Sequence, residues 1–365
     1  MKIELNNVQK DNELFNGKFN KSSAIVEIFS AMVNGESLDR FGAKADNAVK
    51  YIRELGERAG NGDTTAAVEL NTLRRFVVEG PIMEEMKLLG IFGTYKAVGF
   101  DENVEREVYD YAGERSRVQS ANGDVVFPTT TKKVYPVPTF TVSGGYAVDY
   151  RRIALGDMSK EADGIQLVKT DILNNAKKEI FKKIIKAIDN ASGVKHYLES
   201  NTLTKTAVDA ELTKIRRYGR PTIAGDYAVL SQFTPWAGYV GNINNVNVTG
   251  VSQKALEEIA QNGLLSAYNG CILSEIENPY NEFELTDDGS DFKTLLPAGA
   301  ALIIPTGIQS PIATWTRGGL TSFSGNDVKT GQVMTRFDIE VAADIAKGRE
   351  HMIGVIYDSS IGGLD

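Results

Sequence analysis

Residues 158–189 read MSKEADGIQLVKTDILNNAKKEIFKKIIKAID, and this stretch decides the fold. Its apolar residues recur at steps of three and four, which places them on one stripe of an α-helix. They are Ile165, Val168, Ile172, Ala176, Ile180, Ile184 and Ile188, with Leu173, Phe181 and Ile185 at the flank. At 1.5 Å per residue the helix would be about 40 Å long or more. We therefore expect it to cross a whole domain.

The opposite face of the predicted helix is charged. Its charged residues are Lys169, Asp171, Lys177, Lys178, Lys182 and Lys183. Ser159 is a suitable N-cap, and Glu161 and Asp163 follow it near the positive end of the helix dipole. The simplest interpretation of the lysines is a solvated helix face, and a local basic surface is the alternative. The whole chain has a formal net charge of −8, which argues against a protein whose main work is neutralising nucleic-acid phosphates.

The first quarter of the chain is predicted to be helical after a polar arm. Residues 1–21 are rich in Asn and Lys and lack periodicity, so we expect them to be extended. Helices are predicted from Ser22 onward, over Leu38–Leu55 and over Thr64–Glu79. Gly80-Pro81 is expected to break the third helix, because proline lacks an N–H and clashes with the preceding turn. A short helix is expected after the break.

A long, polar hairpin is predicted after this helical quarter. Asn122-Gly123 separates two strand-like runs and is a strong hairpin signal, because both residues tolerate a positive φ. The polar residues along it include Glu114, Arg115, Arg117, Gln119, Asp124, Lys132 and Lys133. A two-stranded hairpin with so little apolar surface is not stable alone. We expect it to lie on something else, and a neighbouring copy of the chain is one candidate.

The region after the long helix is predicted to be one compact α/β unit. Helices are expected over Ala207–Arg217 and over Ser252–Gly263, where Gly263 ends the second helix. Short buried strands are expected over Ala228–Phe233, Cys271–Ile276 and Ala301–Ile304.

The clearest strand of the chain lies near its end. In residues 332–346, QVMTRFDIEVAADIA, the odd positions are apolar or β-branched and several even positions are charged. Strict alternation predicts a long strand with one buried and one wet face. The apolar run Met352–Tyr357 then predicts a returning, more fully buried strand.

The sequence contains few residues that could serve in catalysis or metal binding, and they do not form a recognised motif. The two histidines, His196 and His351, lie far apart in the sequence, and each is expected to be structural. Cys271 is the only cysteine, which excludes an intrachain disulfide. No HExxH, CxxC or GxSxG motif is present. We therefore expect no catalytic, cofactor-binding or metal-binding residues, and we do not expect an enzyme.

Several glycine-rich or acidic runs resemble phosphate-, dinucleotide- or calcium-binding loops but lack the full motif of each. Residues 60–64, 143–145 and 318–319 fit neither the phosphate loop nor the dinucleotide fingerprint, so turns and close backbone packing are the better interpretation. Residues 287–291 resemble part of a calcium loop but lack its full spacing and its closing Glu.

The chain shows no signal for secretion or for a membrane. Residues 1–20 contain no apolar signal core. No stretch approaches the roughly 20 apolar residues that span a bilayer. We expect the chain to be cytoplasmic where it is made.

The order of these segments resembles the major capsid proteins of tailed bacteriophages, which share the Hong Kong 97-like fold. In that family an N-terminal arm, an extended E-loop, a P-domain with a long spine helix and an A-domain follow one another, and long P-domain strands close the chain. Two stretches here look like the A-domain and the closing strands. They are YNGCILSEIENPYNEF with LLPAGAALIIPTG, residues 268–283 and 295–307, and TRFDIEVAADIAKGREHMIGVIYDSS, residues 335–360.

The resemblance implies an α+β capsid fold with the following division. Residues 1–94 would be the N-terminal arm and helical extension, 95–157 the E-loop hairpin with flanking P-domain strands, 158–192 the spine helix of the P-domain, 193–311 the α/β A-domain, and 312–365 the closing P-domain strands.

The resemblance also implies a function. The chain would be a structural major capsid protein that self-assembles into the hexamers and pentamers of an icosahedral phage head. It would be made in the host cytoplasm and end in the virion. Portal and scaffolding proteins would be its partners, and packaged double-stranded DNA would lie near it without specific contact. An encapsulin-type bacterial nanocompartment shell that encloses a cargo enzyme is the alternative.

Overall fold

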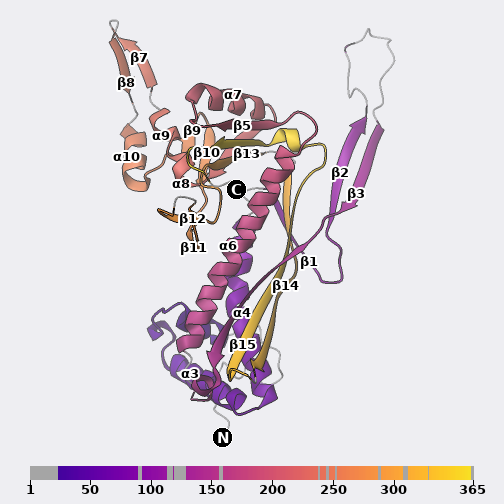
Figure 1. Ribbon diagram of the computed structural model, residues 1–365, viewed down its shortest axis with the longest axis vertical. Coiled ribbons are helices and arrows are strands. Elements are labelled where there is room, and N and C mark those ends of the chain that lie inside the picture. Colours follow the sequence, from indigo (N-terminus) through magenta and orange to yellow (C-terminus); the bar gives the residue numbers. More distant parts are fainter. Residues whose placement is uncertain are drawn as a thin grey trace.

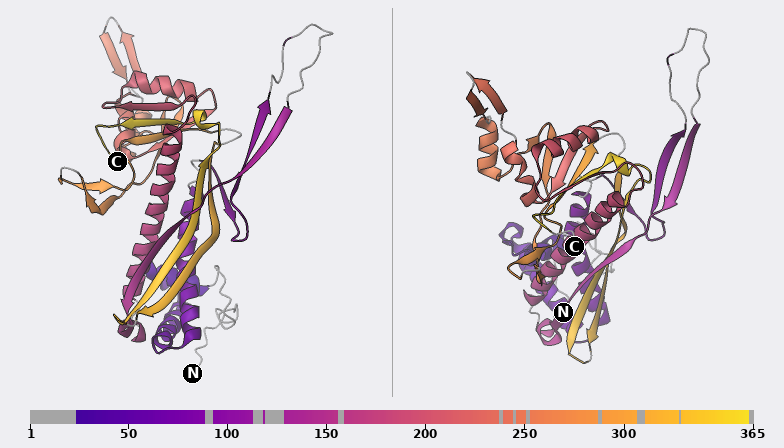
Figure 2. Two further views of the ribbon diagram at one scale, coloured as in Figure 1. Left: turned by 45° about the vertical axis from the view of Figure 1, so that its right-hand side comes forward. Right: turned by 45° about the horizontal axis from the view of Figure 1, so that its top comes forward.

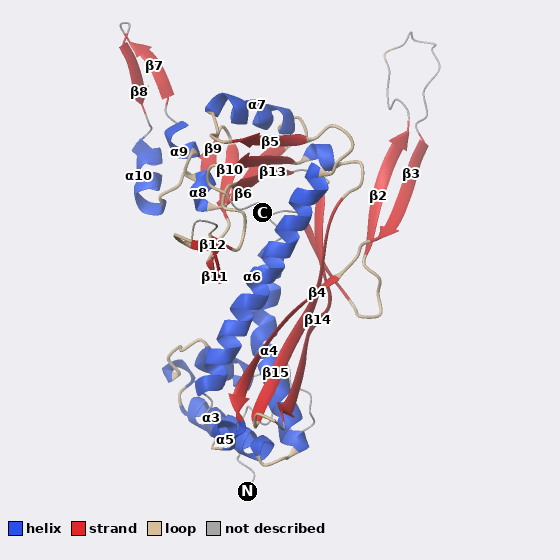
Figure 3. Ribbon diagram, viewed as in Figure 1, coloured by secondary structure: helices blue, strands red, loops and turns tan. Residues whose placement is uncertain are grey.

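A computed structural model of the chain describes residues 24–88, 93–112, 118, 129–155, 159–236, 239–243, 246–250, 253–286, 289–306, 311–327 and 329–362. The molecule is elongated, and a long helix runs most of its length between a helical group at one end and a compact α/β unit at the other (Figures 1 and 2). Helices and strands are mixed throughout (Figure 3), which confirms the expected α+β class.

The long helix and a four-stranded sheet form the centre of the molecule. The helix α6 (Ser159–Asp189) agrees with the predicted boundaries to within one residue. The sheet has the order β1 (Thr94–Val98), β14 (Ile312–Asp327), β15 (Gln332–Ile345) and β4 (Phe140–Asp149). β1 is parallel to β14, and the other pairs are antiparallel.

The apolar stripe of α6 packs on one face of this sheet. Ile165, Val168 and Ile172 are buried, as are Phe337 and Ile339 of β15. Within β4, a Cβ atom on Gly144 would come within 2.9 Å of side-chain atoms of both Val168 and Ile172. This confirms close backbone packing for that glycine run. The buried odd positions of β15 confirm the predicted half-buried strand.

The helical group at the other end of α6 contains five helical elements. They are α2 (Ala24–Val33), the short 3₁₀ helix η2 (Asp39–Phe41), α3 (Ala43–Gly60), α4 (Thr64–Leu88) and α5 (Tyr150–Ala154). α3 starts after a 3₁₀ turn rather than at Leu38, and it continues five residues beyond the predicted end. A turn around Gly62, with a φ of 93°, follows it and confirms the turn interpretation of residues 60–64.

The predicted helix break at Gly80-Pro81 is wrong, because α4 continues through it. An interior proline costs a helix about 3 kcal/mol. Val78 before the proline and Ile82 and Met86 after it are all buried in the main core. Each such side chain contributes about 1.5–3 kcal/mol on burial, so packing of the continuous helix offsets the local cost.

A second, six-stranded sheet forms the compact unit at the opposite end. Its order is β5 (His196–Ser200), β16 (Gly354–Asp358), β13 (Ala300–Thr306), β6 (Arg220–Gly225), β10 (Cys271–Glu275) and β9 (Ala267–Tyr268). The helical elements beside it are α7 (Lys205–Ile215), α8 (Tyr227–Leu230), α9 (Phe233–Trp236), α10 (Gln253–Asn262) and the 3₁₀ helix η4 (Glu350–Met352). The predicted helices that became α7 and α10 are confirmed, as are the strands that became β10 and β13.

The predicted strand over Ala228–Phe233 is wrong. This segment forms α8 and the start of α9, and the strand of this region is β6, just before it. The Asp226 side chain accepts a hydrogen bond of 2.7 Å from the Ala228 N–H and caps α8. A short apolar run fits a strand or a buried helix equally well, and the cap decides between them here.

Three two-stranded hairpins complete the described fold. They pair β2 (Glu105–Ala112) with β3 (Thr129–Pro136), β7 (Tyr239–Ile243) with β8 (Val246–Gly250), and β11 (Tyr280–Leu285) with β12 (Phe292–Thr294). The first two extend outward from the body (Figure 1). Gly318 and Gly319, with φ of 74° and 79°, lie where the register of β14 shifts, so this glycine pair serves a strand irregularity.

Candidate assembly surfaces

The hairpin β2–β3 is the most exposed paired structure near the four-stranded sheet. Its strands pair from Glu105–Pro136 outward to Ala112–Thr129. We call residues 104–106 with 135–137 its root, and residues 107–112 with 129–134 its shaft. Figure 2 shows the hairpin extending away from the body in both further views. The predicted tip, Asn122-Gly123, lies outside the described residues.

The root is fixed to the sheet by polar contacts that are buried at Arg106 and partly buried at Tyr135. The Arg106 guanidinium donates a hydrogen bond of 3.1 Å to the Pro311 carbonyl oxygen and lies over the Trp315 ring. The Tyr135 hydroxyl donates to Oδ2 of Asp344 at 2.7 Å and accepts from the Lys347 N–H at 3.2 Å. Val104 and Val137 are buried beside them in a small apolar cluster. The root is therefore part of the body.

Burial of the root changes its ionisation. Burial raises the pKa of the Tyr135 hydroxyl to about 12 and lowers the pKa of Arg106. Burial also raises the pKa of the Asp344 carboxyl above its ordinary value, although the Tyr135 hydrogen bond works in the opposite direction. Partial removal of these groups from water is the common cause of the three shifts.

The shaft is held less fully than the root, although the Arg349 guanidinium donates a hydrogen bond of 3.0 Å to the Tyr109 carbonyl oxygen. Val108 is buried, but Tyr109 is 41% exposed and Val134 is 47% exposed. Lys132 and Glu107 form an ion pair of 2.7 Å whose two side chains are both exposed. Such surface pairs contribute about 0–1 kcal/mol. A two-stranded hairpin is marginally stable at best, so the exposed face with Tyr109 and Val134 is a candidate contact surface.

The outer face of the four-stranded sheet, opposite α6, is a second candidate surface. Phe323 is 59% exposed and Met334 is 49% exposed on it. Ser143, Gly145 and Ala147 of β4 line a groove of about 820 Å³ together with residues of β14 and β15. β4 is an edge strand of the described sheet. Adjacent apolar side chains on an uncovered sheet face are typical of an interaction surface.

A buried ion pair holds the helical group to the long helix. The Arg74 side chain of α4 donates from Nε to Oε1 of Glu161 in α6, and both side chains are buried. The Tyr146 hydroxyl of β4 donates to the same oxygen at 3.3 Å, and burial raises the pKa of Tyr146. The elements α4, β4 and α6 therefore meet at the Glu161 carboxylate. Glu161 was expected only to lie near the positive end of the helix dipole, and it also joins these three elements.

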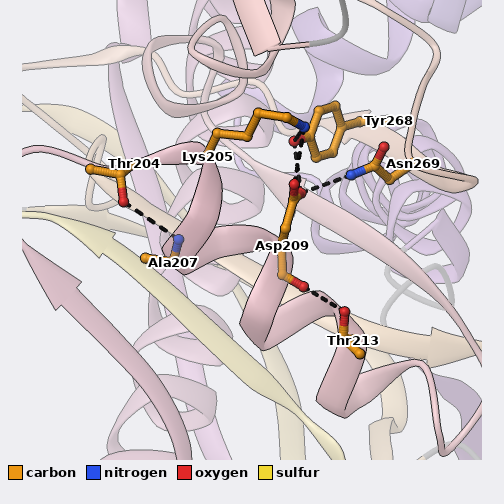
Figure 4. A network of polar contacts seen from close by, with 7 residues as sticks. All are labelled: Thr204, Lys205, Ala207, Asp209, Thr213, Tyr268 and Asn269. Atoms are coloured by element: carbon orange, nitrogen blue, oxygen red, sulfur yellow. Dashed lines mark hydrogen bonds and ion pairs between the residues drawn. The ribbon is translucent and has the colours of Figure 1, made fainter.

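A polar network fixes α7 to the turn between β9 and β10 (Figure 4). The Asp209 carboxylate accepts hydrogen bonds of 2.7 Å from the Tyr268 hydroxyl and from Nδ2 of Asn269, and Nζ of Lys205 lies 3.0 Å from it. The Thr204 side chain accepts from the Ala207 N–H and caps α7. Tyr268 is buried. These groups satisfy one another, so we interpret the network as structural.

The residues examined for chemistry are not brought together by any of these contacts. His196 lies in β5 with its Nδ1 3.3 Å from Oε2 of Glu211, and His351 lies in η4 with its ring against Tyr218. Cys271 is buried in β10, and burial raises its thiol pKa. Residues 287–288 of the calcium-like run lie outside the described residues.

Two features are absent from the described residues. Over this part of the chain, nowhere do three or more His, Cys, Asp or Glu side chains gather in a way that could hold a metal ion. None of the helices that the structure describes combines the length and the apolar character that crossing a membrane requires.

The sequence analysis missed the exposed sheet face, although a signal for it existed. Met334 is an apolar residue at an even, solvent-side position of the alternating strand. Phe323 lies in β14, which the resemblance placed among the closing strands but which no periodicity predicted, because glycine, serine and threonine interrupt its apolar pattern. An apolar residue on the wet face of a predicted strand was therefore the usable indication.

Comparison with known proteins gives one family. Residues 4–357 match the family described as SPbeta prophage-derived putative capsid protein YonB. No curated protein sequence matches the chain.

The fold is also similar to that of several solved structures. One is from Gordonia phage Cozz, at 10% identity over 74% of this chain and 85% of that chain, with a TM-score of 0.46. Another is the asymmetric unit of the bacteriophage PhiM1 mature capsid, at 11% identity over 72% and 84%, with a TM-score of 0.44. A third is the holo-SrpI encapsulin complex from Synechococcus elongatus, at 10% identity over 74% and 86%, with a TM-score of 0.43.

Proposed function

We propose that copies of this chain, which belongs to the family of the SPbeta prophage-derived putative capsid protein YonB, assemble with one another into a closed shell. Membership makes the chain a phage-type capsid protein and confirms the resemblance that the order of its segments indicated. Its role is structural.

The exposed shaft of β2–β3 is the observation that carries the proposal. It presents Tyr109 and Val134 to solvent beyond a firmly held root. The outer sheet face presents Phe323 and Met334 beside a groove. Burying apolar side chains of both surfaces against each other would stabilise the hairpin by the same effect that stabilises a core. The shaft of one copy would thus be completed by the sheet of the next.

The parts of the chain would divide the work as follows. The spine helix (158–192), the flanking strands (95–157) and the closing strands (312–365) would form a stiff P-domain. The A-domain (193–311) would pack around the symmetry axes of hexamers and pentamers, and residues 1–94 would be the arm and helical extension. The shell would be the virion capsid around double-stranded DNA, made in the host cytoplasm with portal and scaffolding partners. No catalytic activity is proposed.

Negative-stain microscopy of the purified chain tests the proposal. The wild type should form closed shells, whereas Tyr109→Asp/Val134→Asp should give soluble subunits, because two charges replace the apolar groups that the next copy would bury. The matched control, Tyr109→Phe/Val134→Ile, should still form shells. Circular dichroism checks that all three chains fold.

Two outcomes would change the interpretation. Shells of normal size from the charged double variant would contradict the role of the shaft. Shells that co-purify with a cargo enzyme rather than with DNA or a portal protein would instead support an encapsulin-type nanocompartment.

A further inference from the structure

One row in the second half of α6 carries three lysines between two asparagines. Asn174, Lys178, Lys182, Lys186 and Asn190 follow one another at steps of four, and α6 includes all but the last. Residues four apart are neighbours on a helix surface, about 6 Å apart along the axis. The row contains no carboxylate. Lys186 and Asn190 are exposed, whereas Asn174, Lys178 and Lys182 are half-buried along the edge of the buried stripe.

The lysines of this row differ from most other lysines of the described chain in having no partner. Elsewhere Nζ atoms lie near carboxylates, as in the pairs Lys160–Asp163, Lys195–Asp189, Lys205–Asp209 and Lys214–Glu211. Within the described part of the chain, Lys178, Lys182 and Lys186 form neither a hydrogen bond nor an ion pair. The chain has more acidic than basic residues, so a shortage of carboxylates does not explain why these three lysines are unpaired.

Ordinary structural roles do not account for the row. The helix dipole favours Lys186 in the last turn, but its effect falls off before Lys182 and Lys178. Lys183 is different, because its Nζ lies 4.0 Å over the Phe140 ring and burial lowers its pKa. Of the acids nearest in sequence, Asp189 is engaged by Lys195 and Glu179 acts on Lys183. Like charges at steps of four repel each other, so a bound anion would reduce the repulsion between these lysines.

We propose that this row binds the phosphate backbone of double-stranded DNA. The spacing of about 6 Å is close to every second phosphate of one strand, which lie about 3.4 Å apart along the duplex axis. The amide groups of Asn174 and Asn190 can donate to further phosphates or sugars. Three charges give weak, sequence-independent and salt-sensitive binding. The choice of DNA as the anion rests on the proposed function.

Fluorescence anisotropy with a labelled 30-base-pair duplex tests the proposal on the full-length chain between about 50 and 200 mM salt. Each phosphate contact contributes about 0.9 to the slope of log affinity against log salt. Lys178→Gln/Lys182→Gln/Lys186→Gln should therefore flatten the slope by about 2 to 3. The affinity ratio of wild type to variant should shrink about 40-fold across this range.

The matched control removes the same charge elsewhere. Lys44, Lys50 and Lys329 are exposed on α3 and on the turn after β14, and Lys44→Gln/Lys50→Gln/Lys329→Gln should keep the wild-type slope to within about 1. Equal losses in both triple variants, or no binding by the wild type at 50 mM salt, would overturn the proposal.

Microscopy of the same preparations separates this inference from the proposed function. If the wild type and both triple variants form shells and the slope of log affinity against log salt is the same for all three, the capsid role is supported and DNA binding by this row is contradicted. Failure of the wild type to form shells would contradict the assembly proposal, while the anisotropy would still report on the row.

Discussion

The body of the molecule and the shaft of its first hairpin use the same polar contacts in opposite surroundings. In the body, the Arg74–Glu161 ion pair is buried and the half-buried Tyr135 bonds Asp344, and both contacts join separate elements. In the shaft, the Lys132–Glu107 ion pair and Tyr109 are exposed. Burial, rather than residue type, therefore separates the contacts that join elements of the body from the exposed contacts of the shaft.

The largest expected effect concerns the buried ion pair. Glu161→Ala should lower the free energy of unfolding by about 3–5 kcal/mol, because it leaves the Arg74 charge buried without a partner. Urea unfolding of the unassembled chain measures the change. The double variant Arg74→Met/Glu161→Leu should recover most of the stability, since no charge then remains buried. A loss below about 1 kcal/mol for the single variant would erase the contrast with the shaft.

The two tyrosines offer a matched comparison. Tyr135→Phe removes the donor to the partly buried Asp344 carboxylate and should cost about 1–3 kcal/mol. Tyr109→Phe alters an exposed side chain and should change stability by no more than about 0.5 kcal/mol. Both are measured by urea unfolding of the unassembled chain. Equal effects would mean that the root is not part of the body.

The pH dependence of stability should sharpen the description of the root. Because burial raises the pKa of Asp344, the folded chain keeps this proton to a higher pH than the unfolded chain does. The stability that the protonated Asp344 carboxyl contributes is therefore fully present below about pH 3.9, its ordinary pKa. That stability is lost as the pH rises through the raised pKa of the folded chain. Asp344→Asn has no such proton, so the variant should gain stability relative to wild type as pH increases. A pH-independent difference would place the carboxyl in water.

The smallest effect is expected for the exposed ion pair. Glu107→Gln should change the unfolding free energy of the unassembled chain by at most about 1 kcal/mol, because solvent already screens both partners. Double-mutant analysis with Lys132→Gln isolates the pair itself. A coupling energy above about 2 kcal/mol would show that the shaft is buried in the single chain.

Local periodicity was enough to predict the central elements. Steps of three and four gave α6, and strict alternation gave β15, because a long amphipathic pattern leaves one way to bury its apolar side. The same reasoning failed at Pro81, where packing on both sides of the proline kept α4 continuous. It also failed at Ala228–Phe233, where a capping carboxylate turned a short apolar run into helix.

Contacts between distant segments were beyond the sequence. Arg74 and Glu161 are 87 positions apart, and Tyr135 and Asp344 are 209 apart, so no local pattern links either pair. The polar character of the hairpin did predict that it needs a partner. The exposed sheet face that could serve as that partner emerged only with the pairing of β4, β14 and β15.

Hydrogen–deuterium exchange of unassembled subunits and assembled shells tests the central claim most directly, because it reads the backbone of the hairpin itself. The account predicts that the root amides of residues 105–106 and 135 exchange slowly in both states. It predicts that the shaft amides of residues 107–112 and 129–134 become protected at least tenfold only in shells. Equal protection of the shaft in the lone subunit would contradict the claim that the next copy completes it.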